Sequence, residues 1–154
     1  MNRSTALARH WPILPLIGFL SLTGCSSFNR DWRATSAQER GTNGLAGKWE
    51  GTWRSEASGH NDELRCLITE DPTEGCRARF HARYKKLFRF TFEYTVPLQV
   101  EFESGTNRFH GEADLGWLAG GRYQYAGTAT ATNFNSTYEC KYDHGVFQLH
   151  RLPE

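Results

Sequence analysis

From Leu45 onward, apolar and polar residues alternate with a period of two, which is the spacing of a β-strand with one buried and one solvated face. The clearest stretch runs from Gly75 to Lys86, where alternate positions from Ala78 to Tyr84 are apolar and the positions between them are basic. The same parity assigns inward faces to Trp49–Trp53, Leu64–Ile68, Phe88–Tyr94, Leu98–Phe102, Phe109–Leu115, Tyr123–Ala129, Phe134–Tyr142 and Phe147–Arg151.

Turn residues separate these segments at the short spacings of an antiparallel meander, as at Ser58-Gly59-His60-Asn61, Asp71-Pro72-Thr73 and Asp143-His144-Gly145. The pattern predicts an all-β domain of about eight or nine strands and no helical period after Arg40. Consecutive hairpins with one dry face must either pack as two sheets or close into a barrel. Because closure removes exposed edges, we expect a single antiparallel up-and-down β-barrel, with a sandwich as the alternative.

The first 24 residues have a different pattern, in which Arg3, Arg9 and His10 precede an apolar stretch from Trp11 to Leu22. A basic segment, a short apolar segment and small residues at a cleavage site describe a secretory signal peptide. The apolar stretch is shorter than the roughly 20 residues that a transmembrane helix needs. We therefore expect cleavage rather than a membrane-spanning anchor.

The end of this segment, Leu22-Thr23-Gly24-Cys25, resembles the lipobox of bacterial lipoproteins. The resemblance implies loss of residues 1–24 and lipidation of Cys25, with thioether-linked and N-acyl (palmitate-type) chains that bind the membrane. An ordinary secretory signal is the alternative. Ser26 stands where an Asp would favour retention at the inner membrane, so we expect an outer-membrane anchor facing the periplasm.

Residues 25–44 are polar and have no sustained apolar period, so they predict a tether between the lipid and a domain spanning residues 45–154. Within it, Trp32 is expected either at the lipid interface or folded back onto the domain. Loss of Arg3 and Arg9 from the 18 basic residues leaves 16 against 17 acidic ones, a net charge of −1. This balance gives no case for binding nucleic acid.

The first strand, Gly47-Lys48-Trp49-Glu50-Gly51, resembles the Gly-x-Trp opening of the calycin barrels, which comprise lipocalins, fatty-acid-binding proteins and avidins. Those proteins commonly close the barrel with an arginine of the last strand. By this resemblance Arg151 packs across Trp49 in a cation–π contact, and the default role is binding of a small apolar molecule.

Three stretches also resemble an uncharacterised group of small bacterial proteins: 47–55, 115–125 and 142–147. This second resemblance supports the extent of the domain and implies no activity.

Three cysteines remain after Cys25, and all have inward parity. Cys66 and Cys76 flank the Asp71-Pro72 turn, so a disulfide across one hairpin is expected in an oxidising envelope, with Cys140 left as a thiol. The alternatives are a bridge to Cys140 and three separate buried thiols. Their spacing matches no zinc pattern, and we expect no metal or other cofactor.

Aromatic residues of inward parity suit the wall of a ligand site, because their rings offer apolar surface and their hydroxyl groups orient the ligand. The alternative is a filled core, because an eight-stranded barrel is only just wide enough for its side chains. The candidate ligand-lining residues are Trp49, Trp53, Tyr84, Tyr94, Tyr123, Tyr125 and Tyr138.

The sequence favours a non-catalytic, membrane-anchored module that binds a small hydrophobic or amphipathic ligand. His60 with Asp62, and Asp143 with His144, occupy turn positions and accompany no nucleophile motif, so we expect no enzyme. The second hypothesis is a protein-interaction or inhibitor lipoprotein that acts through Trp117 and Leu118 in a glycine-rich loop. The basic row from Arg77 to Lys85 is expected to be a solvated strand face paired with carboxylates on neighbouring strands.

Overall fold

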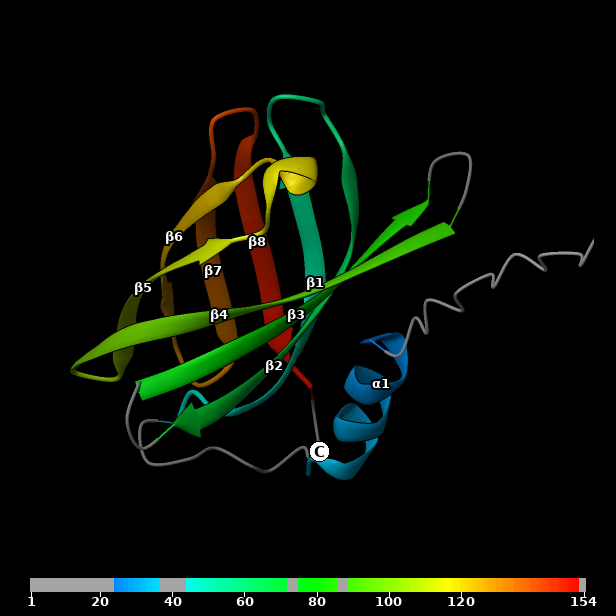
Figure 1. Cartoon of the computed structure of the whole chain (residues 1–154). Helices are drawn as coiled ribbons and strands as arrows, with labels where there is room; N and C mark the ends of the chain where they lie inside the picture. The colour runs from blue at the N-terminus through cyan, green and yellow to red at the C-terminus, as the bar shows by residue number, and fades with distance from the viewer. Residues whose placement is uncertain (1–23, 37–43, 72–74, 86–88, 153–154) are drawn as a thin grey trace, which may run out of the picture.

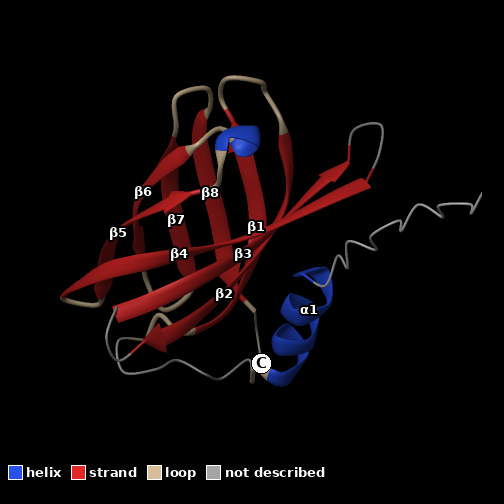
Figure 2. Cartoon of the chain, viewed as in Figure 1, coloured by secondary structure: helices blue, strands red, loops and turns tan. Residues whose placement is uncertain are grey.

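A computed structural model describes residues 24–36, 44–71, 75–85 and 89–152, which form one helix packed outside an eight-stranded barrel (Figures 1 and 2). The elements are α1 (Gly24–Ala34), β1 (Gly47–Ser55), β2 (Asn61–Asp71), β3 (Gly75–Lys85), β4 (Arg89–Glu103), β5 (Thr106–Asp114), the 3₁₀ turn η1 (Trp117–Ala119), β6 (Arg122–Ala129), β7 (Asn133–Glu139) and β8 (His144–Arg151).

Each strand pairs antiparallel with the next, and β8 pairs with β1 to close the barrel. The closing ladder runs from Trp49 opposite Arg151 to Ser55 opposite Gly145. Gly51 lies in this ladder, where a Cβ atom would overlap the backbone of Gln148. The single closed barrel predicted from the alternation is therefore confirmed.

The expected ninth strand is absent from the described residues, because two predicted segments join as β4, which continues through Pro97. Proline donates no backbone hydrogen bond, so it is tolerated where a strand is unpaired on one side. The ladder between β4 and β5 begins next to it, at Leu98 opposite Gly111. Beyond that point β4 pairs with β3 alone as far as Arg89, and the two strands extend past the barrel wall (Figure 1).

Residues of inward parity form the core, but the parity rule fails at two strand ends. Phe102 is 65% exposed because it lies beyond the packed part of the barrel, near the β4–β5 turn. Tyr142 is 68% exposed because β7 ends at Glu139 and leaves Tyr142 in the following turn. The alternation predicts inward faces for both residues, and both predictions are wrong.

The segment expected to be a polar tether is helical over its first part, from Gly24 to Ala34. Phe28 and Trp32 are four residues apart, so their rings share a face of α1 and stack with centroids 5.5 Å apart. Phe28 is fully buried and stacks on His81 of β3, at 4.9 Å. Trp32 folds back onto the domain, since Arg65 of β2 lies over its ring.

An ion-pair network also joins α1 to the barrel. Arg79 of β3 contacts Asp31 of α1 and Glu93 of β4, each at 2.6 Å. Further along the same basic row, Arg83 contacts Glu63 at 3.1 Å. Arg79 and Arg83 are thus paired with carboxylates, as cross-strand pairing predicts. The expectation of a solvated face is wrong at His81, which is buried because Phe28 of α1 stacks on it.

Candidate functional site

One end of the barrel is open and holds a small cavity of about 50 Å³. In a meander, alternate turns lie at the same end, so the turns after β1, β5 and β7 gather here, at the top of Figure 1. The cavity is lined by Trp53, Leu64, Ala82, Tyr84, Phe92, Tyr94, Leu115, Tyr123, Tyr125, Tyr138, Asp143 and Phe147. A water molecule needs roughly 10–15 Å³ by this kind of measure, so the space admits only a few non-hydrogen atoms.

Below the cavity, aromatic rings fill the interior. Phe80 lies at the centre of the stack, with ring centroids 5.2 Å from Tyr94, 5.3 Å from Phe147 and 6.1 Å from Tyr125. Such packing leaves no channel for a long acyl chain. The filled-core alternative therefore holds for most of the barrel, and the ligand-site alternative is restricted to the open end.

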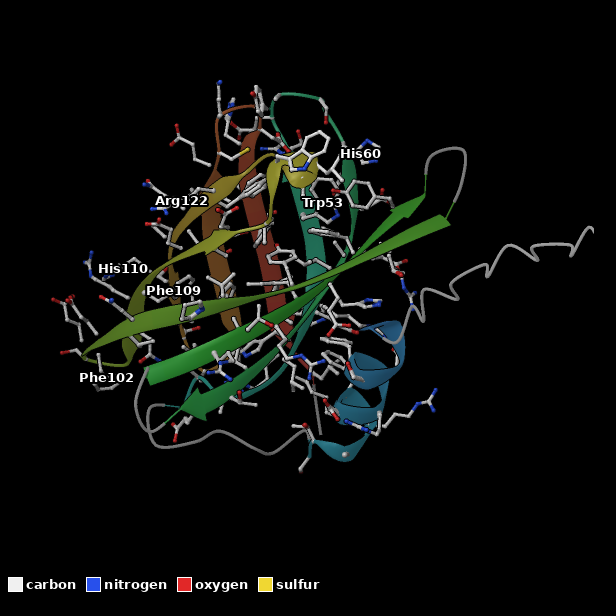
Figure 3. All side chains as sticks on the ribbon, in the orientation of Figure 1. Trp53, His60, Phe102, Phe109, His110 and Arg122 are labelled. Atoms are coloured by element: carbon white, nitrogen blue, oxygen red, sulfur yellow. The ribbon has the colours of Figure 1, made fainter. Side chains whose placement is uncertain are left out.

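Three rings from different elements meet at one side of the cavity. Trp53 of β1 lies 4.8 Å from Tyr84 of β3, and His60 of the β1–β2 turn lies 5.5 Å from Trp53 and 5.6 Å from Tyr84. Figure 3 shows Trp53 and His60 on neighbouring parts of this open end. His60 is held by Asp62, whose Oδ2 lies 3.2 Å from the His60 Nε2.

Asp143 brings a carboxylate into the cavity wall from the β7–β8 turn. The Ser55 hydroxyl donates to its Oδ1 at 2.6 Å, and the Tyr138 hydroxyl donates to its Oδ2 at 3.1 Å. Ser55 in turn accepts hydrogen bonds from the backbone N–H and the hydroxyl of Ser58. These bonds fix the carboxylate beside the tyrosine rings.

Tyrosine pKa values show the electrostatic character of this end. Burial raises the pKa of Tyr84, and the negative charges of Asp143 and then Asp62 raise it further. Burial is also the largest cause of the raised pKa of Tyr138 and of Tyr123, and Asp143 adds to both. The hydroxyl groups are therefore neutral at physiological pH, chiefly because they are buried, and the Asp143 carboxylate adds to the effect.

Six of the seven predicted lining residues line this cavity, and Trp49 is the exception. Trp49 lies at the opposite end, fully buried, with the Arg151 guanidinium 4.1 Å from its ring centroid. The predicted closure by Trp49 and Arg151 is confirmed, but the prediction of Trp49 as a ligand-lining residue is wrong. Its ring is occupied by the arginine and its indole N–H by the carbonyl of Leu45.

The register overturns the expected disulfide. Cys66 stands opposite Phe80, whereas Cys76 stands opposite Glu70, four residues further along β2. At about 3.3 Å per residue this offset separates the two cysteines by roughly 13 Å, too far for a bridge. Cys66 is a buried thiol, and burial raises its pKa.

The Trp117–Leu118 turn borders the open end. The Tyr123 hydroxyl, whose ring lines the cavity, donates to the carbonyl of Ala119 at 2.9 Å. Gly120 then takes φ of 101°, a left-handed conformation that ends the turn. Trp117 and Leu118 are 84% and 82% exposed, as the loop hypothesis expected.

A wider hollow of about 1200 Å³ lies on the outer face of β4–β8. Its lining includes outward-facing polar residues such as Gln99, His110, Gln124 and Thr137. These positions are ordinary solvated strand-face positions, so the smaller interior cavity is the candidate site.

Sequence reasoning missed Asp143 and Ser55 as parts of the site. Asp143 is a typical turn residue, and Ser55 is the last residue of its strand. The order of the strands could have identified them, because the turns after β1 and β7 must lie at the same end of a meander and so bring Ser55 and Asp143 close together.

The class that fold and site define is a closed eight-stranded antiparallel barrel with an aromatic, acidic cavity at one end. Comparison with protein-family models, with curated proteins and with solved structures finds no match for this chain. No helix among the described residues has the length and apolar character needed to cross a membrane. The same residues contain no cluster of three or more His, Cys, Asp or Glu side chains arranged to hold a metal.

Proposed function

We propose that this chain is a non-catalytic envelope lipoprotein whose barrel binds one end of a small amphipathic ligand at its open end. The observation that carries the proposal is the cavity lined by Trp53, five tyrosines and Asp143 in an otherwise filled barrel. Because ordinary ligand pockets measure roughly 300–1,000 Å³, only a head group enters. The rest of the ligand lies outward, beside partly exposed Phe92 and the Trp117–Leu118 turn.

A cavity-filling variant tests this role. Ala82 lines the cavity and is buried, so Ala82→Phe places a ring in the space that the ligand would occupy. Native mass spectrometry of the protein after mild extraction reveals a co-purified small molecule, which we expect the Ala82→Phe variant to lose. Ala126→Phe is the matched control, because Ala126 is exposed on an outward position of β6. A wild-type protein that carries no ligand and takes up none from a panel of amphiphiles would overturn the proposal.

The anchor is Cys25, and we propose an outer-membrane location facing the periplasm. Cys25 precedes Phe28 by three residues, and Phe28 is buried against the barrel. Three helical residues rise only about 4.5 Å, so the barrel would lie directly against the lipid rather than at the end of a long tether. Palmitate labelling tests the anchor: Cys25→Ser should lose the label, and a labelled serine variant would contradict the assignment.

Protein interaction through the Trp117–Leu118 turn is the second candidate function. The observation favouring it is the nearly complete exposure of two adjacent large apolar side chains. A partner should be captured by the wild-type protein and lost with Trp117→Ala, while capture by Ala82→Phe persists. Capture that persists with Trp117→Ala and is lost with Ala82→Phe would instead favour binding at the cavity.

A further inference from the structure

The cavity wall carries charge of one sign. Asp143 is its single charged residue among the described lining residues, and no basic side chain lines it. Asp62 adds a second carboxylate behind His60, with its Oδ2 3.2 Å from the His60 Nε2. An anionic ligand would meet repulsion here, and a purely apolar one would cover a carboxylate without pairing it.

The rings complement the carboxylate. Aromatic faces attract cations through their quadrupoles, and a group of rings around a small space is the usual way that proteins recognise substituted ammonium ions. Trp53, the best ring for this interaction, lies against Tyr84 and His60 at the cavity side, and Tyr138 is hydrogen-bonded to Asp143 itself. The wall therefore offers several ring faces and one fixed negative charge.

Trp53 also carries a buried polar group at this end of the barrel. Its side chain is only 5% exposed and lines the cavity, yet its indole N–H has no hydrogen-bond partner among the described residues. Buried donors are normally paired.

We propose that the ligand head bound in this cavity is a small organic cation, a substituted ammonium group that packs against the cavity side of the Trp53 and Tyr84 rings and pairs with the Asp143 carboxylate. This inference rests on the proposed ligand-binding function and names the chemical class of the ligand. A methylated ammonium group suits this cavity better than a hydrated metal ion does. Its methyl groups can contact the aromatic rings directly, whereas a metal ion would keep its water ligands between itself and the rings.

The first experiment compares two probes of equal shape and different charge. Choline carries a trimethylammonium group, and 3,3-dimethylbutan-1-ol replaces the nitrogen with carbon. Titration of the full chain, followed by calorimetry and tryptophan fluorescence, should show choline binding at least tenfold more tightly than the neutral alcohol.

Substitutions then assign the preference to the site. Asp143→Asn keeps an oxygen acceptor for Ser55 or Tyr138 but removes the charge, so choline affinity should fall at least tenfold while affinity for the neutral alcohol is unchanged. Glu103→Gln is the control, because Glu103 is an exposed carboxylate next to the β4–β5 turn, where it pairs with Arg108. Tyr84→Leu provides a second test if Asp143→Asn lowers the melting temperature, since Leu keeps apolar volume without a ring.

The outcomes separate the two proposals. Equal affinity for both probes, or choline binding that survives both site variants, overturns the cationic assignment and leaves ligand binding intact. Binding of a neutral or anionic amphiphile in place of choline also overturns it. Absence of binding for every probe and every amphiphile overturns both proposals.

Discussion

The two ends of this barrel use the same kinds of side chain in opposite ways. At the closed end, Arg151 donates hydrogen bonds to the carbonyls of Gly44, Ala46 and Ala131, and its guanidinium covers the buried ring of Trp49. At the open end, Trp53 is also buried, but its ring faces a cavity and its N–H has no partner among the described residues. The ring of Trp49 is covered by a cation that the chain itself supplies, whereas the ring of Trp53 borders an open space.

The largest expected loss of stability comes from removing the tryptophan side chain at the closed end. Trp49→Ala removes a fully buried ring and the surface that Arg151 covers, so we expect a loss of about 3–5 kcal/mol in the free energy of unfolding. Urea denaturation measures it. A loss below about 1 kcal/mol would mean that the two ends do not differ in their structural role.

Removing the arginine should come second. Arg151→Met keeps the apolar stem but leaves three backbone carbonyls without their donor, at a cost of about 2–3 kcal/mol after water rehydrates part of them. Arg151→Lys should recover only a fraction, because an ammonium group cannot reproduce the forked geometry. Full recovery by Lys in the same denaturation assay would contradict this account of closure.

The side wall under α1 offers a third test, with a smaller effect. His81 is 3% exposed, and burial lowers its pKa, with Arg83 and Arg65 adding to this and Glu93 opposing it. The unfolded state therefore binds the proton more readily, so stability is complete above the ordinary His pKa of about 6.5 and falls as pH decreases through the folded value. Thermal melts between pH 8 and pH 4 should show this loss.

The matched variants for that test are His81→Phe and His150→Gln. Phe retains the stack on Phe28 without a titrating group, so it should flatten the pH dependence in the range where His81 titrates. His150 is exposed on β8, so its substitution should leave the dependence as in the wild type. An unchanged profile for His81→Phe would assign the acid sensitivity elsewhere.

At the open end, the hydrogen bonds should contribute less to stability than the contacts at the closed end. Ser55→Ala removes the donor to Asp143 and the acceptor for Ser58, and we expect a loss of about 1.5–2 kcal/mol in unfolding free energy. The same variant should weaken choline binding, since it releases the carboxylate from its fixed position. A loss as large as that of Trp49→Ala would mean that the open end contributes to stability as much as the closed end does.

The smallest expected change is that of Trp117→Ala. The side chain is almost wholly exposed, so the free energy of unfolding should change by no more than about 0.5 kcal/mol. Comparison with Trp49→Ala in the same assay shows how widely the loss of unfolding free energy differs between an exposed and a buried tryptophan. A large destabilisation would show that the turn packs against the barrel more closely than its exposure indicates.

Much of the fold could be predicted because a strand's alternation depends on local sequence. The parity from Ala78 to Tyr84 identified the inner face of β3, and the inward tyrosines from Tyr84 to Tyr138 line the cavity. Local sequence carried less information about helix α1. A polar segment with one Phe–Trp pair has little helical signal of its own, and the helix is stabilised by the barrel surface on which Phe28 packs.

The sequence by itself determined which side chains face inward away from the strand ends, because a period of two allows each strand only one inward face, and it favoured a closed barrel over a sandwich. Tertiary structure decided the register that separates Cys66 from Cys76. It also decided which end is sealed by Arg151 and which aromatic rings surround Asp143. Parity assigns a residue to a face of the sheet, whereas its position along the barrel axis depends on the register of strand pairing, which the turn sets within a hairpin and the closure of the barrel sets between β1 and β8.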